Sequence, residues 1–231
     1  MERISRSRGI TFYKVMKRDQ ITKKITENLS TTDQYDVWDK LTPSDSDYMM
    51  YSPNPVGYNS VAEQRYLMQN LLVGFYGNSI LDIGCGRADL YDFISDFYEN
   101  LNFTYHGIDH NPIMIDLAKQ KYDVDCQLGA FENADLPKTD WIVANGVFTP
   151  RRCELEDEDL KKLFEDIDIL YQSASVALSF NLLNPINNTQ HEGFFYVHPG
   201  LVLDMLIEKY KTVVLRNNYS EDVYTIIIYK I

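Results

Sequence analysis

Two aspartates and two glycines are spaced as a nucleoside-binding site would require. The segment Ser79-Ile-Leu-Asp-Ile-Gly-Cys-Gly-Arg-Ala-Asp-Leu90 places Asp82, Gly84 and Gly86 at and just after the end of an apolar run. The two glycines would let the backbone approach a ligand more closely than any side chain allows. Asp82 could accept hydrogen bonds from an amino group held in that turn. Asp109 ends the next apolar segment, where a ribose-binding carboxylate belongs. The spacing predicts a nucleoside cofactor.

The position three residues after the second glycine distinguishes between cofactors. A dinucleotide-binding turn requires G-x-G-x-x-G, whose third glycine allows close helix–strand packing around a pyrophosphate. Asp89 stands in the place of that glycine, and its carboxylate would repel a pyrophosphate. S-adenosylmethionine contains an adenosine and an amino acid end but no phosphate, so it suits this turn better than NAD.

The form Asp82-Ile-Gly-Cys-Gly86, with an acid at the end of the following strand, resembles the class I S-adenosylmethionine-dependent methyltransferase family. The resemblance covers residues 56–231. It implies that Asp109 binds the ribose hydroxyls, that Met114 packs on the adenine and that 141–148 faces the reactive methyl. The implied cofactor-binding residues are Arg65, Asp82, Gly84, Cys85, Gly86, Asp109, His110, Met114, Phe131, Glu132, Asn145 and Gly146.

Four of the singled-out positions have a second interpretation. Arg65 could hold the cofactor carboxylate as a bidentate pair, or it could be an exposed helix residue. Cys85 is expected to be a small filler beside the turn rather than a nucleophile. Arg151 and Arg152 could clamp an anionic substrate or pair with the acidic run at 154–159.

The segment before the glycine turn is similar to that of a poorly characterised bacterial and phage branch of the family. Members of that branch carry a V-G-W-x-S-like segment, and this chain has Val56-Gly-Tyr-Asn-Ser60, with Tyr58 in place of the tryptophan. The segments 145–148 and 195–199 also resemble motifs of this branch. The similarity implies no particular substrate.

The candidates for catalysis lie in the segment 181–199. His191, Tyr196 and His198 follow the expected fifth strand, where a loop would cover the methyl acceptor together with the segment 42–58. A histidine there could act as general base if the acceptor must lose a proton, or it could be an ordinary surface residue. No metal is expected, because a His-x6-His spacing without a third ligand is poor evidence for one.

A parallel sheet is needed to bring these segments together. Helical patterns alternate with apolar segments, and the last two segments are joined by a short turn, which predicts an antiparallel pair. This alternation predicts an α/β fold: a Rossmann-like, doubly wound, mostly parallel sheet with an antiparallel last strand. The expected strands are 80–83, 103–108, 124–128, 141–144, 175–182, 211–215 and 223–229. The expected helices are 60–76, 88–98, 112–122, one that begins in the acidic run at 154–159, and 199–210.

Charge divides the chain into two parts. Its 231 residues suit one domain with decorations, and their net charge is −12. Residues 1–24 carry +6, so the remainder carries −18. We expect a basic N-terminal arm and loop-rich lid over 1–55 and the methyltransferase domain over 56–231. The acidic remainder would repel a phosphate backbone, which disfavours a nucleic-acid partner.

The acceptor is predicted to be a small molecule or a protein. The N/D-P-P-Y/F motif of many nitrogen-directed nucleic-acid methyltransferases is replaced by Ala144-Asn-Gly-Val-Phe148. Two alternatives stay open: a DNA or RNA methyltransferase that docks through the basic arm, and a non-catalytic S-adenosylmethionine-binding module. The oligomeric state is not predicted.

Cysteine use and hydropathy favour a cytoplasmic protein, in the host cytoplasm if it is viral. Cys85, Cys126 and Cys153 are too scattered for a disulfide framework or a zinc site. No apolar run reaches the roughly 20 residues of a membrane helix, and no secretory signal is expected, so no membrane partner is predicted.

Overall fold

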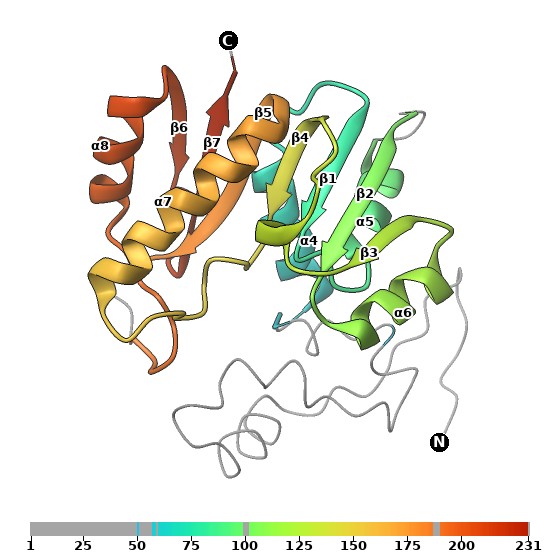
Figure 1. Cartoon of the computed structure of the whole chain (residues 1–231), viewed down its shortest axis with the longest axis horizontal. Helices are drawn as coiled ribbons and strands as arrows, with labels where there is room; N and C mark the ends of the chain where they lie inside the picture. Colours follow the sequence, from blue (N-terminus) through green and yellow to red (C-terminus); the bar gives the residue numbers. More distant parts are fainter. Residues whose placement is uncertain (1–49, 51–56, 59, 99–101, 187–189, 231) are drawn as a thin grey trace.

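A seven-stranded sheet in the order β3-β2-β1-β4-β5-β7-β6 forms the centre of the protein (Figure 1). The computed structural model describes residues 50, 57–58, 60–98, 102–186 and 190–230. The strands are β1 (Ser79–Ile83), β2 (Thr104–Asp109), β3 (Asp125–Leu128), β4 (Thr139–Ala144), β5 (Ala174–Leu183), β6 (Thr212–Arg216) and β7 (Val223–Tyr229). Of the expected N-terminal arm, residues 1–49 and 51–55 lie outside this description.

The direction of the strands confirms the predicted fold class. β1 pairs in parallel with β2 and β4, β2 with β3, and β4 with β5. β7 lies between β5 and β6 and is antiparallel to both. The last strand of the chain is therefore inserted into the sheet, and β6 forms its edge. The carboxyl ends of β1, β2 and β4 meet at the lower edge in Figure 1.

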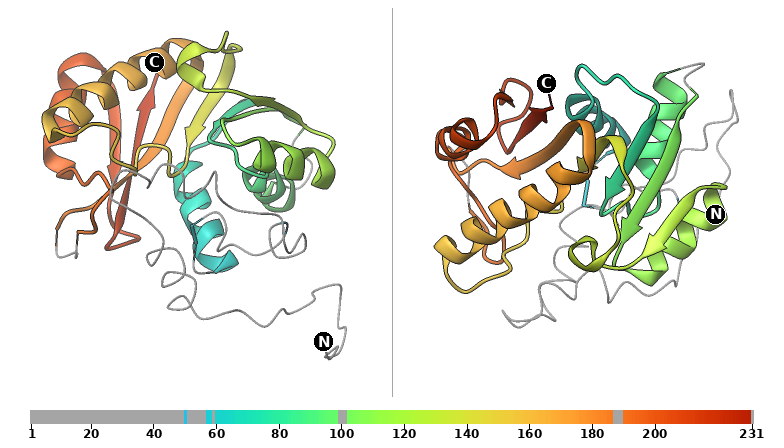
Figure 2. Two further views of the ribbon diagram at one scale, coloured as in Figure 1. Left: turned by 60° about the horizontal axis from the view of Figure 1, so that its bottom comes forward. Right: turned by 45° about the horizontal axis from the view of Figure 1, so that its top comes forward.

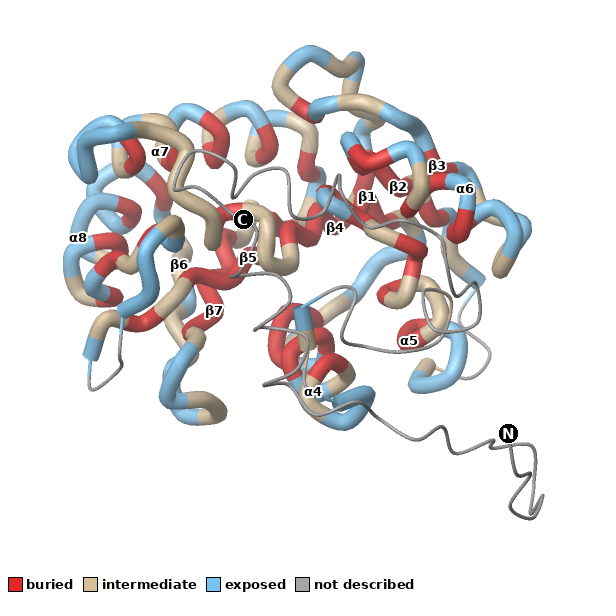
Figure 3. Tube along the Cα trace, turned by 90° about the horizontal axis from the view of Figure 1, so that it is seen from below, coloured by how far each residue is buried: buried red, intermediate tan, exposed pale blue. Residues whose placement is uncertain are grey.

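Helices cover both faces of the sheet, as Figures 2 and 3 show. They are α4 (Val61–Leu71), α5 (Asp89–Phe97), α6 (Pro112–Lys121), α7 (Glu156–Ser173) and α8 (Pro199–Lys209), with a short 3-10 turn, η2 (Phe131–Asn133). One apolar cluster joins α7 and α8 to Leu81 and Ile83, and another joins α4 and α5 to Ile80 and Trp141. Successive side chains of β1 thus enter opposite cores, which explains its continuous apolar character.

The helices begin at residues that local chemistry favours. The Ser60 hydroxyl accepts from the Glu63 amide at 3.0 Å, and Asn111 caps α6, whose first residue is Pro112. The acidic run lies in the first turn of α7, where carboxylates offset the helix dipole. These starts were predicted from the sequence.

The predicted end of α4 is wrong, because the prediction extended the helix to residue 76. The helix ends at Leu71, and Gly74 adopts a left-handed φ of +76°. A Cβ at Gly74 would lie 2.8 Å from the Tyr229 hydroxyl, which donates to the carbonyl of Val73. Packing against β7 therefore ends the helix earlier than the local pattern indicates.

Among the described residues, no helix has the length and apolar composition that crossing a membrane requires.

Candidate cofactor and acceptor site

The glycine turn after β1 is fixed by its neighbours on both sides. The amides of Gly84 and Cys85 donate to the carbonyl of Ile108 at 2.8 and 3.1 Å. Gly84 and Gly86 have φ values of +65° and +54°, which favour glycine. A Cβ at Gly84 would also lie 2.7 Å from Cγ2 of Val147, in the loop after β4. The turn therefore sits between β2 and the loop after β4.

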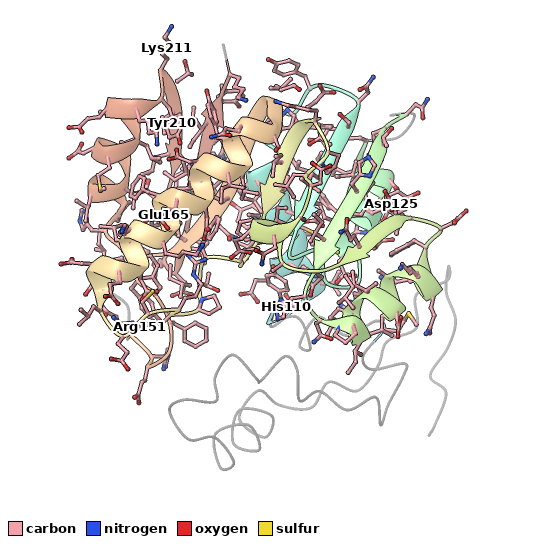
Figure 4. All side chains as sticks on the ribbon, in the orientation of Figure 1. His110, Asp125, Arg151, Glu165, Tyr210 and Lys211 are labelled. Carbon is pink, nitrogen blue, oxygen red and sulfur yellow. The ribbon has the colours of Figure 1, made fainter. Side chains whose placement is uncertain are left out.

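Asp109 connects this turn to the start of α6. Its Oδ2 accepts from the Gly86 amide and its Oδ1 from the Asn111 amide, both at 2.8 Å. The carboxylate is buried, and each oxygen has a further lone pair. Asp109 could therefore accept from ribose hydroxyls while it holds the turn. His110 follows on the same edge, with a half-exposed ring whose Nδ1 lies 3.8 Å from Asp109 Oδ1 (Figure 4).

Asp82 is a buried carboxylate in an acidic environment. Its Oδ2 accepts from the Tyr105 hydroxyl at 2.7 Å. Burial raises the pKa of Asp82 to about 7; the Tyr105 hydrogen bond opposes this shift, and the charges of Asp109 and Asp89 add to it. No cation of the described part of the chain contributes to this shift. A ligand with a cationic amino group would supply the missing charge.

The Asp89 carboxylate is paired with two cationic side chains, which the sequence did not indicate. It accepts from Arg87 Nε and Gln64 Nε2, both at 2.8 Å, and from Lys121 Nζ at 3.1 Å. The repulsion of a pyrophosphate expected from Asp89 is therefore weakened. Asp82 and Asp109 are the carboxylates that a phosphate would meet at the turn. The donor set fits S-adenosylmethionine, which has no phosphate and carries positive charge.

Arg65 faces α5 and not the glycine turn that precedes it. Its guanidinium bonds to Asp96 and Asp92 and lies 5.8 Å from the centre of the Phe93 ring. This placement matches the alternative interpretation of Arg65 as a surface residue of the helix. Its neighbour Gln64, which is buried, is the α4 side chain that reaches the start of α5.

Cys85 packs beside a second thiol, that of Cys126 in β3. A Cβ at Gly107 would lie 2.8 Å from Sγ of each cysteine, so only glycine fits between them. Interaction with Cys126 and burial raise the pKa of the Cys85 thiol. A protonated, buried thiol agrees with the expected role of a small filler.

Only some of the predicted residues in the loops after β2 and β3 lie near the glycine turn. The Gly129 amide donates to the carbonyl of Asp109 at 2.9 Å, which joins the loop after β3, with the predicted residues Phe131 and Glu132, to the end of β2. Met114 is buried against Leu117, at the start of α6. Phe131, however, joins the core cluster under α7, and Glu132 lies 3.9 Å from Lys162. Among the residues that the structure describes, nothing lies within 4 Å of a Cβ added at Gly129 or Gly146, so space remains beside both.

A polar chain joins the ends of β4 and β5. The Gly146 amide donates to Asn181 Oδ1 at 2.7 Å, and Asn181 Nδ2 donates to Asn145 Oδ1 at 2.7 Å. Tyr58 is hydrogen-bonded to Asn145 and lies near Asp82; burial raises its pKa, as do the charges of Asp82 and Asp89. Asn181 was not among the predicted site residues. Its signal in the sequence was a polar residue within the apolar run of β5.

The predicted catalytic residues divide into two groups. The His191 amide donates to the Tyr196 hydroxyl at 3.3 Å, so these two lie together after β5. His198 caps α8 instead, because its Nδ1 accepts from the Gly200 amide at 3.1 Å. In the loop after β4, Arg151, labelled in Figure 4, bonds to Asp159 of the acidic run, which confirms the pairing predicted for it. The Arg152 guanidinium bonds instead to Asp166, beyond that run in α7.

Comparison with known proteins agrees with this geometry. A family model described as a methyltransferase domain matches residues 80–174, from the start of β1 to the start of β5. "Putative methyltransferase Rv1506c" of Mycobacterium tuberculosis is 26% identical over 156 residues, which are 66% of this chain and 93% of that protein.

Solved methyltransferase structures share the fold. The plantazolicin methyltransferase BpumL, in complex with a pentazolic desmethylPZN analog and SAH, has a TM-score of 0.58 and 15% identity, covering 90% of this chain and 99% of its own. Human N-acetylserotonin methyltransferase, in complex with SAM, has a TM-score of 0.54 and 14% identity, covering 90% of this chain and 65% of its own. The domain match, the relative from Mycobacterium tuberculosis and the shared fold together support a class I S-adenosylmethionine-dependent methyltransferase, with S-adenosylmethionine as its cofactor.

Proposed function

We propose that the protein methylates a small-molecule or protein acceptor at the edge formed by the loops after β4 and β5. The burial of Phe148 carries this proposal. Enzymes that act on a nucleobase commonly flip it out and stack it against aromatic or apolar side chains. Phe148 stands at the aromatic position of the nucleic-acid motif, but it is only 1% exposed and packs edge-to-face on Phe180 at 5.5 Å. It is not available to stack on a base.

Charge and the structural relatives support the same acceptor class. Residues 25–231 carry a net charge of −18, which repels a nucleic-acid backbone. The relatives with a similar fold are named for plantazolicin and N-acetylserotonin, neither of which is a nucleic acid. A DNA or RNA acceptor, held through the basic residues 1–24, is the second candidate because those residues carry +6.

In this proposal, the glycine turn and its two carboxylates hold the cofactor. Asp109 accepts from the ribose hydroxyls, and Asp82 pairs with the amino group of the methionine end. When bound, S-adenosylmethionine supplies the methyl group: its carbon–sulfur bond breaks with the electron pair left on sulfur, and a lone pair of the acceptor forms the new bond. The protein aligns the acceptor and excludes water, and it needs no covalent intermediate.

If the acceptor must lose a proton, a residue of the loop after β5 removes it. His191 and Tyr196 lie together there, and a neutral histidine can take a proton near neutral pH. The proposal keeps these two residues of the three predicted ones. His198 is left out, because its Nδ1 is occupied as the cap of α8.

The proposal is tested by following the label from tritiated S-adenosylmethionine. Wild-type protein and Asp109→Ala are incubated with small-molecule, protein and nucleic-acid fractions of a cell extract, after calorimetry with S-adenosylhomocysteine has shown binding. Label in the small-molecule or protein fraction, lost in the variant, supports the proposal. Label confined to nucleic acid would favour the second candidate. A protein that binds the cofactor and labels no fraction would be a binding module.

A further inference from the structure

The hydrogen-bond chain at the ends of β4 and β5 has a direction that a backbone amide fixes. The Gly146 N–H can only donate, so the atom that it meets on Asn181 at 2.7 Å must be the side-chain oxygen. The nitrogen of Asn181 therefore faces the other way. This assignment follows from the chemistry of the peptide group and does not depend on telling amide oxygen from nitrogen.

The same logic fixes the orientation of Asn145. The Asn181 nitrogen can only donate, so its partner on Asn145 at 2.7 Å must also be the oxygen. Asn181 is only 3% exposed, and this burial holds its side chain in place. The oxygen of Asn145 is thus engaged inside the protein. What the half-buried Asn145 can present toward a ligand is its NH₂ group, which only donates.

Tyr58 shows where the Asn145 amide lies. Its phenol is hydrogen-bonded to Asn145. Tyr58 also lies near Asp82, and Val147, two residues after Asn145, packs where a Cβ of Gly84 would be. The Asn145 amide therefore lies beside the glycine turn, where it meets an oxygen.

We propose that the methyl acceptor atom is an oxygen, held by the Asn145 NH₂ group, and that Asn181 is the positioning residue that orients this group. A neutral amine has one lone pair, which it must use to attack the methyl carbon. An oxygen has a second lone pair, which can accept from Asn145 during the attack. An amine that attacks has no second lone pair, so it would turn its own N–H groups toward the Asn145 NH₂ group, and two donors cannot pair. This inference rests on the proposed function.

The oxygen can belong to a carboxylate or to a phenol, and the proton balance differs between them. A carboxylate has already lost its proton to solvent at neutral pH, so only the new O–C bond forms. A phenol loses its proton to water or to His191 as that bond forms. Mild alkaline hydrolysis separates the two products, since it releases methanol from a methyl ester and leaves an aryl methyl ether intact.

The orientation of the amides can be tested without any acceptor. Long-range HNCO spectra of the labelled full-length protein bound to S-adenosylhomocysteine detect couplings across hydrogen bonds. We expect couplings from the Gly146 amide nitrogen to the side-chain carbonyl carbon of Asn181 and from the Asn181 side-chain nitrogen to that of Asn145. A coupling from the Asn145 side-chain nitrogen to the Asn181 carbonyl, or the first coupling without the second, would overturn the proposal.

The acceptor atom is tested with S-adenosylmethionine labelled with ¹³C in its methyl group and the fraction that the protein labels. The carbon shift of the product distinguishes O-methyl from N-methyl, and an N-methyl product would overturn the inference while leaving the proposed function standing. No product from protein that binds the cofactor would instead overturn the proposed function, and the NMR result would still decide the orientation of Asn145.

Asn181→Asp provides the matched variant. The introduced carboxylate can still accept from the Gly146 amide, but it offers Asn145 an oxygen, so the Asn145 amide turns and loses its donor toward the acceptor. We expect kcat/KM to fall about ten- to hundredfold, with unchanged affinity for S-adenosylhomocysteine. Asn184→Asp, the same change just after β5, removes a bond to the Glu221 carbonyl, away from Asn145, and should keep the activity. Equal activity of the two variants would contradict the assignment.

Discussion

The loops after β1 and β2 and the loops after β4 and β5 are both held firmly, but by different groups. After β1 and β2, a side chain of the proposed cofactor site adds to the backbone bonds of the turn: Asp109 binds two backbone amides. The loop after β5 is joined to the loop after β4 by backbone bonds. The Phe195 amide donates to the Thr149 carbonyl at 2.8 Å, and the Arg151 amide to the Gly193 carbonyl at 2.9 Å, while His191 is exposed.

This difference determines which residues can be substituted without loss of stability. In the cofactor half, a substitution at a ligand-binding residue also removes a structural bond, so binding and stability fall together. In the acceptor half, exposed side chains can change while the backbone keeps the loop in place. The fold therefore constrains the cofactor more tightly than the acceptor, and four predictions test this contrast.

The largest effect is expected for Asp109→Ala. The substitution leaves the half-buried amide of Gly86 and the buried amide of Asn111 without their charged partner, so the free energy of unfolding should fall by about 2–4 kcal/mol. Affinity for S-adenosylhomocysteine should fall at least about a hundredfold, because the ribose contact and the turn are lost together. Urea unfolding and calorimetry measure the two quantities. Asp116→Ala, on the exposed face of α6, is the control. If Asp109→Ala lost affinity for S-adenosylhomocysteine without losing stability, the contrast between the cofactor half and the acceptor half would be wrong.

Gly107→Ala tests how tightly the sheet is packed under the turn. The added methyl would meet both Sγ atoms, of Cys85 and Cys126, at 2.8 Å, and overpacking of this kind costs about 1–3 kcal/mol. Urea unfolding should show this loss, and Cys126→Ala in the same chain should recover part of it. A variant as stable as the wild type would show that the cysteines can move apart.

The pH dependence of cofactor binding tests Asp82. Its pKa in the folded protein is about 7 against an ordinary 3.8, so the folded state keeps this proton to a higher pH than the unfolded chain does. The contribution of Asp82 to stability is therefore full below the ordinary value and is lost as pH rises through about 7. A cationic ligand group needs the ionised form, so affinity should weaken about tenfold per pH unit below 7. Calorimetry over this range should show a flat profile for Asp82→Asn; an equally steep profile in the variant would exclude Asp82 as the source.

The smallest effect is expected at His198, the one predicted catalytic residue with a structural role. His198→Ala removes the cap of α8 and should cost about 1 kcal/mol in thermal or urea unfolding. His198→Asn, which can cap the helix but cannot act as a base, should restore stability and retain methyl transfer. If His198→Asn binds the cofactor normally but no longer transfers the methyl group, His198 takes part in catalysis. The acceptor half would then also contain a residue with both a structural and a functional role.

Most of the sheet and the cofactor turn were predictable because their signals are local. The strand β1, the glycines after it and Asp109 at the end of β2 are each encoded within a few residues. The position of β7 between β5 and β6 was not, since a short turn predicts an antiparallel pair and does not say which strand of the pair joins β5. Asn181, the partner of Asn145, lies 36 residues away from it along the chain.

The sequence by itself determined the fold class, the cofactor and the two carboxylates that lie beside the glycine turn, because strand periodicity and a glycine turn fix backbone geometry locally. Only the tertiary structure decided that Arg65 pairs with α5, that His198 caps α8 and that the Asn145 oxygen is engaged by Asn181. The direction of a side chain depends on which groups of distant segments the packing of the helices and the sheet brings within hydrogen-bonding distance, and no local pattern carries that information.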